Sequence, residues 1–243
     1  MSFRLIGEYL RGVGKDKPQG ASAPRIFADD ALQALKPGAT VDFSQALAGF
    51  VLATAAGALF EPPNGTVRVV AYSSLEEAGN LRVHRLYLAA AGSDPEHLLE
   101  VVTDRDNKPL PGEMKLFQQV ADFSPETPEE WDMWYQEHGG DPPMLGAIKL
   151  DWQEKTFGRV WGTDESGNGA LSIPPREYRE HYHHSSGDQF TDMEAMLYGR
   201  QVSDTSEWLF VSILSREGSD GNDEKWIEAY IGVAITPEQV SIY

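Results

Sequence analysis

The chain has 243 residues, no cysteine and a net charge of −18 at pH 7. The lack of cysteine excludes disulfides, thiolate metal sites and cysteine catalysis. The negative charge disfavours nucleic-acid binding, which needs lysine and arginine for the phosphates. Hydrophobic residues make up 41% of the sequence, as in an ordinary folded soluble protein. A cysteine-free chain without a visible secretory signal is expected in the cytoplasm.

Residues 1–25 predict a short basic amphipathic arm followed by a linker. Five basic residues outnumber two acidic ones in this segment, and its apolar residues recur on one side of a helix. Such an arm can lie on an anionic surface, which predicts a peripheral contact at the inner membrane, or it can pack on its own domain. The candidate residues for contact with a partner or a membrane are Phe3, Arg4, Ile6, Leu10 and Arg11.

The longest uncharged stretch runs from Phe43 to Phe60. Its length reaches the roughly 18 residues that a membrane-spanning helix needs. However, it is rich in alanine and glycine and includes Ser44, Gln45 and Thr54. The stretch therefore predicts a buried core segment, with a membrane span as the alternative.

From residue 66 onward, short runs of alternating or apolar residues predict strands. They are separated by glycine, proline, asparagine and aspartate, which are typical of turns, and a hairpin loop is predicted at 106–112. The predicted strands are 66–72, 83–88, 98–103 and 113–118 in the first half, and 145–152, 157–161, 177–183, 194–200, 208–214 and 226–233 in the second.

One helix is predicted between the two sets of strands, at about 128–138. Thr127 can cap the amide of Glu130, Glu130 completes a capping box, and Pro128 suits the first helical position. Two glycines at 139–140 are expected to end the helix. The stripe that should face the core consists of Trp131, Trp134, Tyr135 and His138.

The order of these elements predicts a mainly β protein with a few helices, an α+β fold of two packed antiparallel β-rich halves. The predicted units are the arm at 1–25, a first half at 26–140 that includes the helix, and a second half at 141–243. A weak repeat with an offset of about 110 residues suggests a pseudo-symmetric duplication, although chance similarity among short strands also explains it. The echoes include Leu86-Tyr87 with Leu197-Tyr198, and Leu99-Glu100-Val101 with Leu209-Phe210-Val211.

A histidine cluster near residue 180 is the sharpest local signal for chemistry. His181 and His183 point to the same face of a strand, as two metal ligands require. Asp188, Glu177 or a residue from a neighbouring strand is the candidate third ligand. The alternative is a solvated strand or loop without a metal, because this histidine spacing is common by chance.

A predicted strand of the first half carries a second candidate. Alternation puts Arg85 and Tyr87 on one face of that strand. A buried Arg85 requires a carboxylate partner such as Glu113, which favours a structural ion pair over catalysis. Arg159 beside Trp161 has the same structural interpretation. Nucleophile elbows, phosphate loops and dinucleotide fingerprints are absent from the sequence, so no catalytic residue and no cofactor are predicted.

Four motifs that bear aromatic residues follow one another across the middle of the chain. They are Val83-His84-Arg85-Leu86-Tyr87, Glu113-Met114-Lys115-Leu116-Phe117, Glu129-Glu130-Trp131-Asp132-Met133-Trp134 and Gly158-Arg159-Val160-Trp161. In this order and spacing the chain resembles the YjfK-like bacterial proteins of unknown function. The resemblance implies a cytoplasmic bacterial protein without an assigned reaction. It also implies neighbouring genes for phage-shock-protein-A-like membrane-remodelling proteins, small membrane proteins, ion channels and polyamine-linked synthetases.

Three functions remain open from the sequence. The leading hypothesis is a non-enzymatic cytoplasmic adaptor of a bacterial membrane-stress system, whose partner, by the resemblance, is a phage-shock-protein-A-like protein. The acidic body and the basic arm support this hypothesis, because charge complementarity guides association. The second is a metal-dependent enzyme that uses His181 and His183. The third is an acidic sensor for a small cation such as a polyamine, which requires a concave acidic and aromatic pocket.

Overall fold

The computed structural model describes residues 37–44, 46–63, 65–77, 81–91, 93–94, 96–104, 109–135, 143–162, 174–183, 189–217 and 223–242. This part of the chain is mainly β and contains two α-helices, which confirms the predicted fold class. The predicted arm lies outside the described residues, so the contacts expected of Phe3, Arg4, Ile6, Leu10 and Arg11 stay predictions.

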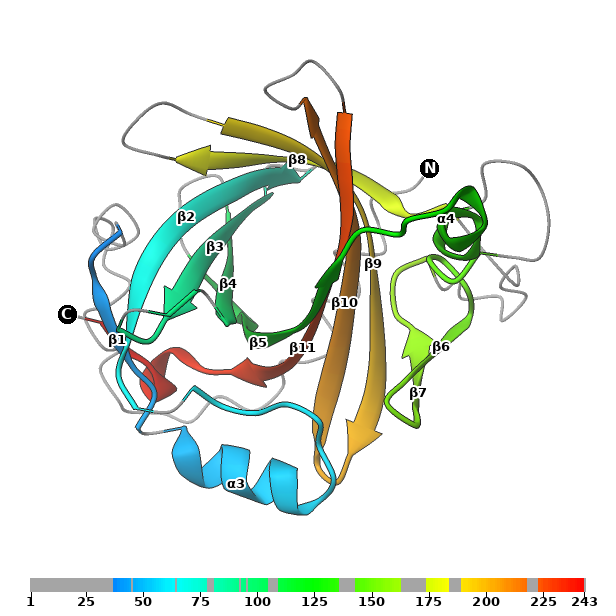
Figure 1. The fold of residues 1–243 in the computed structure, drawn as a ribbon. Coiled ribbons are helices and arrows are strands. Elements are labelled where there is room, and N and C mark those ends of the chain that lie inside the picture. Colours follow the sequence, from blue (N-terminus) through cyan, green and yellow to red (C-terminus); the bar gives the residue numbers. More distant parts are fainter. Residues whose placement is uncertain are drawn as a thin grey trace.

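Eight antiparallel strands form a closed barrel (Figure 1). Each strand pairs with the next around the ring, and the first pairs with the last where Ser73 lies opposite Tyr182. In order around the ring the strands are β2 (Val67–Glu77), β3 (Leu81–Ala89), β4 (His97–Thr103), β5 (Pro109–Phe123), β11 (Asp223–Ile235), β10 (Thr205–Glu217), β9 (Gln189–Val202) and β8 (Arg176–His183). A closed ring leaves no strand of the barrel with an unpaired edge along its whole length.

The two β-rich halves are therefore two four-stranded meanders, β2–β5 and β8–β11, that join at two seams. The seams are β2 with β8 and β5 with β11, so the halves share one sheet and are not two stacked sheets. The predicted echoes agree with this arrangement only in part. Leu99 and Leu209 both pack in the apolar core outside the barrel. Tyr87 instead packs inside the barrel, in its lumen, whereas Tyr198 packs in the core outside it. A duplication stays a prediction.

Every predicted strand overlaps a strand of the structure, but many predicted boundaries differ from the observed ones, and two of the differences have a clear cause. β5 begins at Pro109, inside the predicted loop at 106–112, because Pro109 already pairs with Thr103 of β4. The predicted strand at 145–152 begins only at Lys149, where β6 (Lys149–Trp152) pairs with β7 (Lys155–Arg159). These two strands extend the sheet beside β9, as β1 (Thr40–Asp42) and β12 (Ser241–Ile242) do beside β2.

Alternation sends every second side chain of the barrel into its lumen, which apolar and aromatic residues fill. Rings from different walls meet there: those of Phe117 on β5 and Phe210 on β10 lie 6.2 Å apart. Close packing requires glycine at one position, because a Cβ on Gly232 would lie 2.3 Å from the Phe117 ring. The buried apolar residues of the lumen are Leu75, Val83, Leu98, Val102, Phe117, Met193, Ala195, Leu197, Phe210, Leu214 and Tyr230.

A larger apolar core lies on the outer face of the barrel. The short helix α3 (Leu47–Ala55) and the segment after it contribute Phe50 and Phe60, whose rings meet at 5.4 Å. The segment is held by Glu207 at the start of β10, a fully buried carboxylate. Glu207 accepts hydrogen bonds from the amides of Leu59 (2.6 Å) and Phe60 (2.8 Å) and pairs with Arg200.

The uncharged stretch from Phe43 to Phe60 packs as the predicted core segment. Phe43, Phe50 and Phe60 are buried, whereas Leu52 on the far side of α3 is 72% exposed. The helix itself has nine residues. Within the described parts of the chain, no helix is long and apolar enough to cross a membrane.

The second helix, α4 (Pro128–Trp134), begins as the sequence predicts, with both hydrogen bonds of the capping box between Thr127 and Glu130. Its predicted end is wrong, because Tyr135 is already extended. The carbonyl of Met133 accepts a hydrogen bond from the amide of Met144 (2.8 Å), and that of Trp134 from the next amide (3.2 Å). The returning chain thus takes the place of another helical turn. His138 and the glycines at 139–140 lie outside the described residues.

Candidate functional site

A buried ion-pair network occupies the lumen beside the aromatic rings. Arg85 of β3, whose side chain is 5% exposed, lies 3.3 Å from Glu100 and 3.6 Å from Glu180. The predicted partner Glu113 is wrong, because the strand register places Glu100 directly opposite Arg85, while Glu113 pairs with Lys115 (3.5 Å). The prediction of a structural ion pair at Arg85 is confirmed with different carboxylates.

Glu180 of β8 is the centre of this network. Its two carboxylate oxygens accept hydrogen bonds from the hydroxyls of Tyr87 (2.8 Å) and Tyr182 (3.0 Å), and the hydroxyl of Ser73 donates a third. Burial raises the pKa of Tyr87 well above its ordinary value, and the neighbouring charge of Glu180 raises it further. Both tyrosines therefore stay protonated and act as donors, so that Glu180 is buried but fully hydrogen-bonded.

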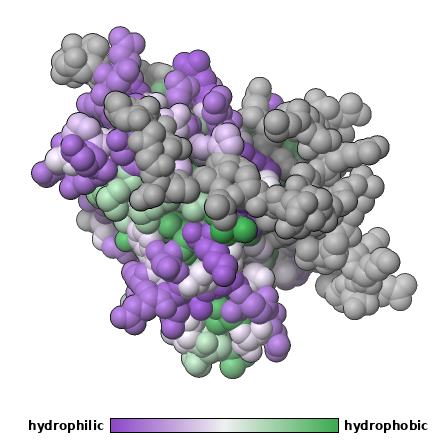
Figure 2. Space-filling model, turned by 90° about the vertical axis from the view of Figure 1, so that its right-hand side faces the viewer, coloured by the Kyte–Doolittle hydropathy of each residue, from purple (hydrophilic) through white to green (hydrophobic). Residues whose placement is uncertain are grey.

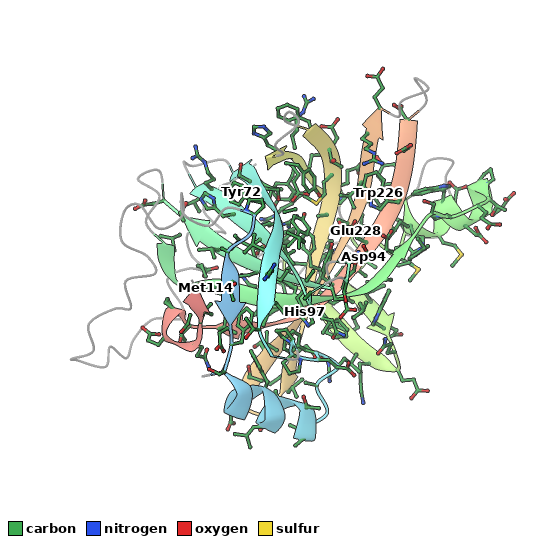
Figure 3. All side chains as sticks on the ribbon, turned by 60° about the vertical axis from the view of Figure 1, so that its left-hand side comes forward. Tyr72, Asp94, His97, Met114, Trp226 and Glu228 are labelled. Carbon is green, nitrogen blue, oxygen red and sulfur yellow. The ribbon has the colours of Figure 1, made fainter. Side chains whose placement is uncertain are left out.

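A second carboxylate, Glu228 of β11, lies in the lumen beside Trp226 (Figure 3). It accepts hydrogen bonds from the indole nitrogen of Trp226 (3.0 Å) and the hydroxyl of Tyr230 (2.8 Å). Burial raises the pKa of Glu228, those two hydrogen bonds lower it, and the charge of Glu180 raises it again, with a net rise. Because these carboxylates are already engaged by protein donors, the network fits a structural role that fixes the barrel.

The candidate binding site lies outside the barrel, where a cavity of about 420 Å³ opens between α4 and the outer faces of β8 to β11. Its volume lies within the range of small-molecule sites. Trp131 of α4, Tyr135 just after the helix and Tyr178 of β8 are among the residues that line it. The capping box and the bonds to the returning chain hold α4 in place over the cavity.

Strand register arranges the charged residues of the cavity in two rows. In the first row Glu177 of β8 lies directly opposite Glu194 of β9, which in turn lies opposite Ile213 of β10. In the second row the order is Arg179, Asp192, Ser215 and Lys225. All of these residues line the cavity.

The two rows differ in their electrostatics. Arg179 lies 3.6 Å from Asp192, and its guanidinium lies 4.9 Å from the centre of the Phe190 ring. Both partners of that pair are about two-thirds exposed, so the pair contributes little to stability. Among these residues the second row holds two cations and one carboxylate, whereas the first row places two carboxylates at directly opposite positions of β8 and β9.

Two of the predicted metal ligands, His181 and His183, belong to β8, and His181 is not among the described residues that line this cavity. His181 lies on the same face of β8 as Glu177, and its ring stacks on that of Phe190 at 4.5 Å. The side chain of His183 and the whole of Asp188 lie outside the described residues. Within the part of the chain that the structure describes, no three histidine, aspartate or glutamate side chains gather as a metal site would require. A metal site at His181 and His183 stays a prediction.

Sequence reasoning missed the cavity because its parts come from distant segments. α4, β8 and β9 meet only in the folded barrel, and Glu177 was considered only as a third metal ligand. No local signal identified the pairing of Glu177 with Glu194, because it depends on the register of the hairpin between β8 and β9. The other residue with a structural interpretation, Arg159, is buried and donates a hydrogen bond to the carbonyl of Gly146 (2.6 Å).

Comparison with known proteins gives one match. The profile of a family described as "Protein of unknown function (DUF2491)" matches residues 40–241, which includes all eight barrel strands, α3, α4 and the cavity. Neither the curated proteins nor the solved structures contain a significant match. The match therefore covers the fold and the candidate site without assigning an activity to either.

Proposed function

This chain belongs to the DUF2491 family of proteins of unknown function, and from its geometry we propose that it is a non-enzymatic interaction protein that binds a basic partner through α4. The observation that carries the proposal is the surface of this helix. Glu126, Glu129 and Glu130 are exposed on or just before its first turn, and Met133 is 58% exposed on its last. Methionine adapts to varied partner surfaces, and the carboxylates favour a basic one.

The helix presents this surface rigidly. Trp134 is buried in the outer core and its ring meets that of Phe123 at 5.8 Å, while the capping box fixes the first turn. Figure 2 faces the side on which α4 lies and shows apolar patches between hydrophilic residues. A pre-organised surface loses little conformational entropy when a partner binds.

The resemblance to YjfK-like proteins supplies the proposed partner, a phage-shock-protein-A-like protein of a bacterial membrane-stress system. In this proposal the protein acts in the cytoplasm, and its basic N-terminal arm adds a peripheral contact at the inner membrane. The net charge of −18 supports a basic protein surface as the partner and disfavours nucleic acid.

A binding measurement with the two purified proteins tests the proposal. The variant Glu129→Lys/Met133→Ser should weaken binding at least about tenfold, since a charge is reversed and an apolar contact is lost at one surface. The matched control is Glu217→Lys/Leu52→Ser, which makes the same exchanges at exposed positions of β10 and α3. Equal loss in both variants, or no binding by the natural sequence, contradicts the proposal.

Recognition of a small cation such as a polyamine is a second candidate function. The cavity beneath α4 favours it, because acidic and aromatic side chains line the same concave space. The two candidates are compatible, since a ligand beneath α4 would act directly on the surface proposed for the partner. Thermal stabilisation by spermidine beyond that given by salt of equal ionic strength tests this candidate.

A further inference from the structure

We infer that Tyr198 and Arg159 are positioning residues for α4, because together they fix the short segment that holds the last turn of this helix. The inference rests on the proposed function where it concerns the partner, since α4 carries the surface proposed to bind it. Successive hydrogen bonds lead from the barrel to residues 144–146, and from these residues to α4.

The first contacts start from two neighbouring strands. Tyr198 of β9 and Arg159 of β7 lie directly opposite each other in the antiparallel register. Their side chains therefore lie next to each other on one face of the sheet. Both residues are buried, and the ring of Tyr198 packs in the outer core. Two neighbouring buried side chains can thus hold one and the same segment of chain.

That segment is held at Gly146, and we call Tyr198 and Arg159 the clamp. The guanidinium of Arg159 donates a hydrogen bond to the carbonyl of Gly146 (2.6 Å), and the hydroxyl of Tyr198 accepts one from its amide (2.8 Å). The same hydroxyl donates to the carbonyl of Met144 (2.9 Å). Burial raises the pKa of Tyr198 to about 12, so the hydroxyl keeps the proton that it donates. Gly146 has a φ of 94°, a conformation that glycine adopts at low cost.

The clamped segment in turn holds the end of α4. The amide of Met144 donates a hydrogen bond to the carbonyl of Met133 (2.8 Å), and the amide of Leu145 donates one to the carbonyl of Trp134 (3.2 Å). α4 has seven residues, and a helix of this length is not stable by itself in water. Its position therefore depends on the contacts that it makes, and loss of the clamp should loosen its last turn.

The position of this turn matters for binding. Met133 lies in it, is 58% exposed and belongs to the surface proposed for the partner. A helix end that moves must become ordered when a partner binds, and this ordering lowers the affinity. The clamp should therefore raise the affinity for the partner without touching it.

Amide hydrogen exchange of the full chain, followed residue by residue by NMR, tests the inference. Tyr198→Phe removes one hydroxyl and leaves the buried ring in place, so the chain should still fold. Exchange of the amides of Met144 and Leu145 should become at least about tenfold faster, because a buried amide and a buried carbonyl lose their partner. Arg159→Met should speed the same two amides, since it removes the donor to the carbonyl of Gly146.

The matched control is Tyr72→Phe, which also removes a hydrogen-bonded hydroxyl, here from the ring nitrogen of His84 (2.6 Å). Tyr72 belongs to β2, which lies on the far side of the barrel from α4 (Figure 1). The control should leave the exchange of the Met144 and Leu145 amides unchanged. Equal acceleration in both tyrosine variants shows that the hydroxyl of Tyr198 only stabilises the fold and overturns the inference, as does unchanged exchange in Tyr198→Phe.

Binding to the purified phage-shock-protein-A-like protein tests the consequence for the partner. Tyr198→Phe should bind at least about threefold more weakly than the natural sequence, and Tyr72→Phe should bind equally well. Undiminished binding by both Tyr198→Phe and Arg159→Met overturns the role of the clamp at the partner surface. If the natural sequence does not bind, the proposed function fails, whereas faster exchange of the two amides in Tyr198→Phe alone still supports the clamp and unchanged exchange overturns it.

Discussion

The network in the lumen predicts a large loss of stability for Arg85→Met. The side chain of Arg85 is 5% exposed and that of Glu180 is 1% exposed, so the substitution leaves a carboxylate buried without its cation. Removing one partner of such a pair costs about 3–5 kcal/mol. Glu180 keeps the hydroxyl donors of Tyr87, Tyr182 and Ser73, which places the expected loss near the lower end, about 3 kcal/mol.

Urea denaturation followed by tryptophan fluorescence measures this loss, and a thermal scan should show a midpoint lowered by about 6–12 °C for a domain of this size. The matched control is Arg179→Met, which breaks an ion pair that is about two-thirds exposed. Its expected loss is about 0–0.5 kcal/mol, since solvent already screens that pair.

A double substitution separates the buried charge from the loss of packing. If the cost comes from the uncompensated carboxylate, Glu180→Gln in the Arg85→Met background should recover about 1–2 kcal/mol. The reasoning is refuted if Arg85→Met costs less than about 1 kcal/mol. It is refuted equally if the two substitutions destabilise additively, because the network would then not act as a unit.

Three further predictions concern glycine packing, a buried anchor and pH. Gly232→Ala should cost about 1–3 kcal/mol in urea denaturation, because its Cβ would lie 2.3 Å from the Phe117 ring; Gly49→Ala in α3, with nothing within 4 Å, should be neutral or stabilising. Glu207→Ala should cost about 3 kcal/mol, since two backbone amides and an arginine lose their acceptor; a loss below 1 kcal/mol would contradict the anchoring role. The raised pKa of Glu228 favours its protonated form in the folded state. The contribution of this group to the free energy of unfolding is therefore fully present below its ordinary pKa of 4.5 and is lost as pH rises through the folded pKa. Glu228→Gln should therefore gain stability relative to the natural sequence between pH 4 and 7, and a constant difference across that range would show that Glu228 does not titrate there.

The strands could be predicted because their signal is local. Alternation of apolar residues over six or seven positions identified each barrel strand, including those that carry Arg85 and Glu180. The start of α4 was predictable for the same reason, since Thr127 and Glu130 make the cap by themselves. Its end was not, because it depends on Met144 returning to bond the last turn.

Closure of the barrel and the contents of the candidate site could not be predicted, because both depend on pairing between distant strands. The sequence showed that a buried Arg85 needs a carboxylate, but choosing Glu180 requires knowing that β2 pairs with β8. The cavity has the same cause, since Trp131 and Glu177 come together only when α4 packs over the second meander. Local patterns thus predicted the strands and the start of α4, but they did not predict which strands pair with each other or where α4 packs.

The two seams of the barrel also bear on how the chain folds. β2 and β8 are separated by about a hundred residues of chain, and the hydroxyl of Ser73 reaches Glu180 across 107 positions. Such contacts form late, because a long loop must close before they give any stabilisation, and folds rich in them fold slowly. During synthesis the first meander is complete before the second exists, so the edge of β5 and the part of β2 that later pairs with β8 have no partner until then. Unpaired edges of this kind recruit strands from other chains, and the first meander is therefore the part of the protein that most needs protection until its other half is made.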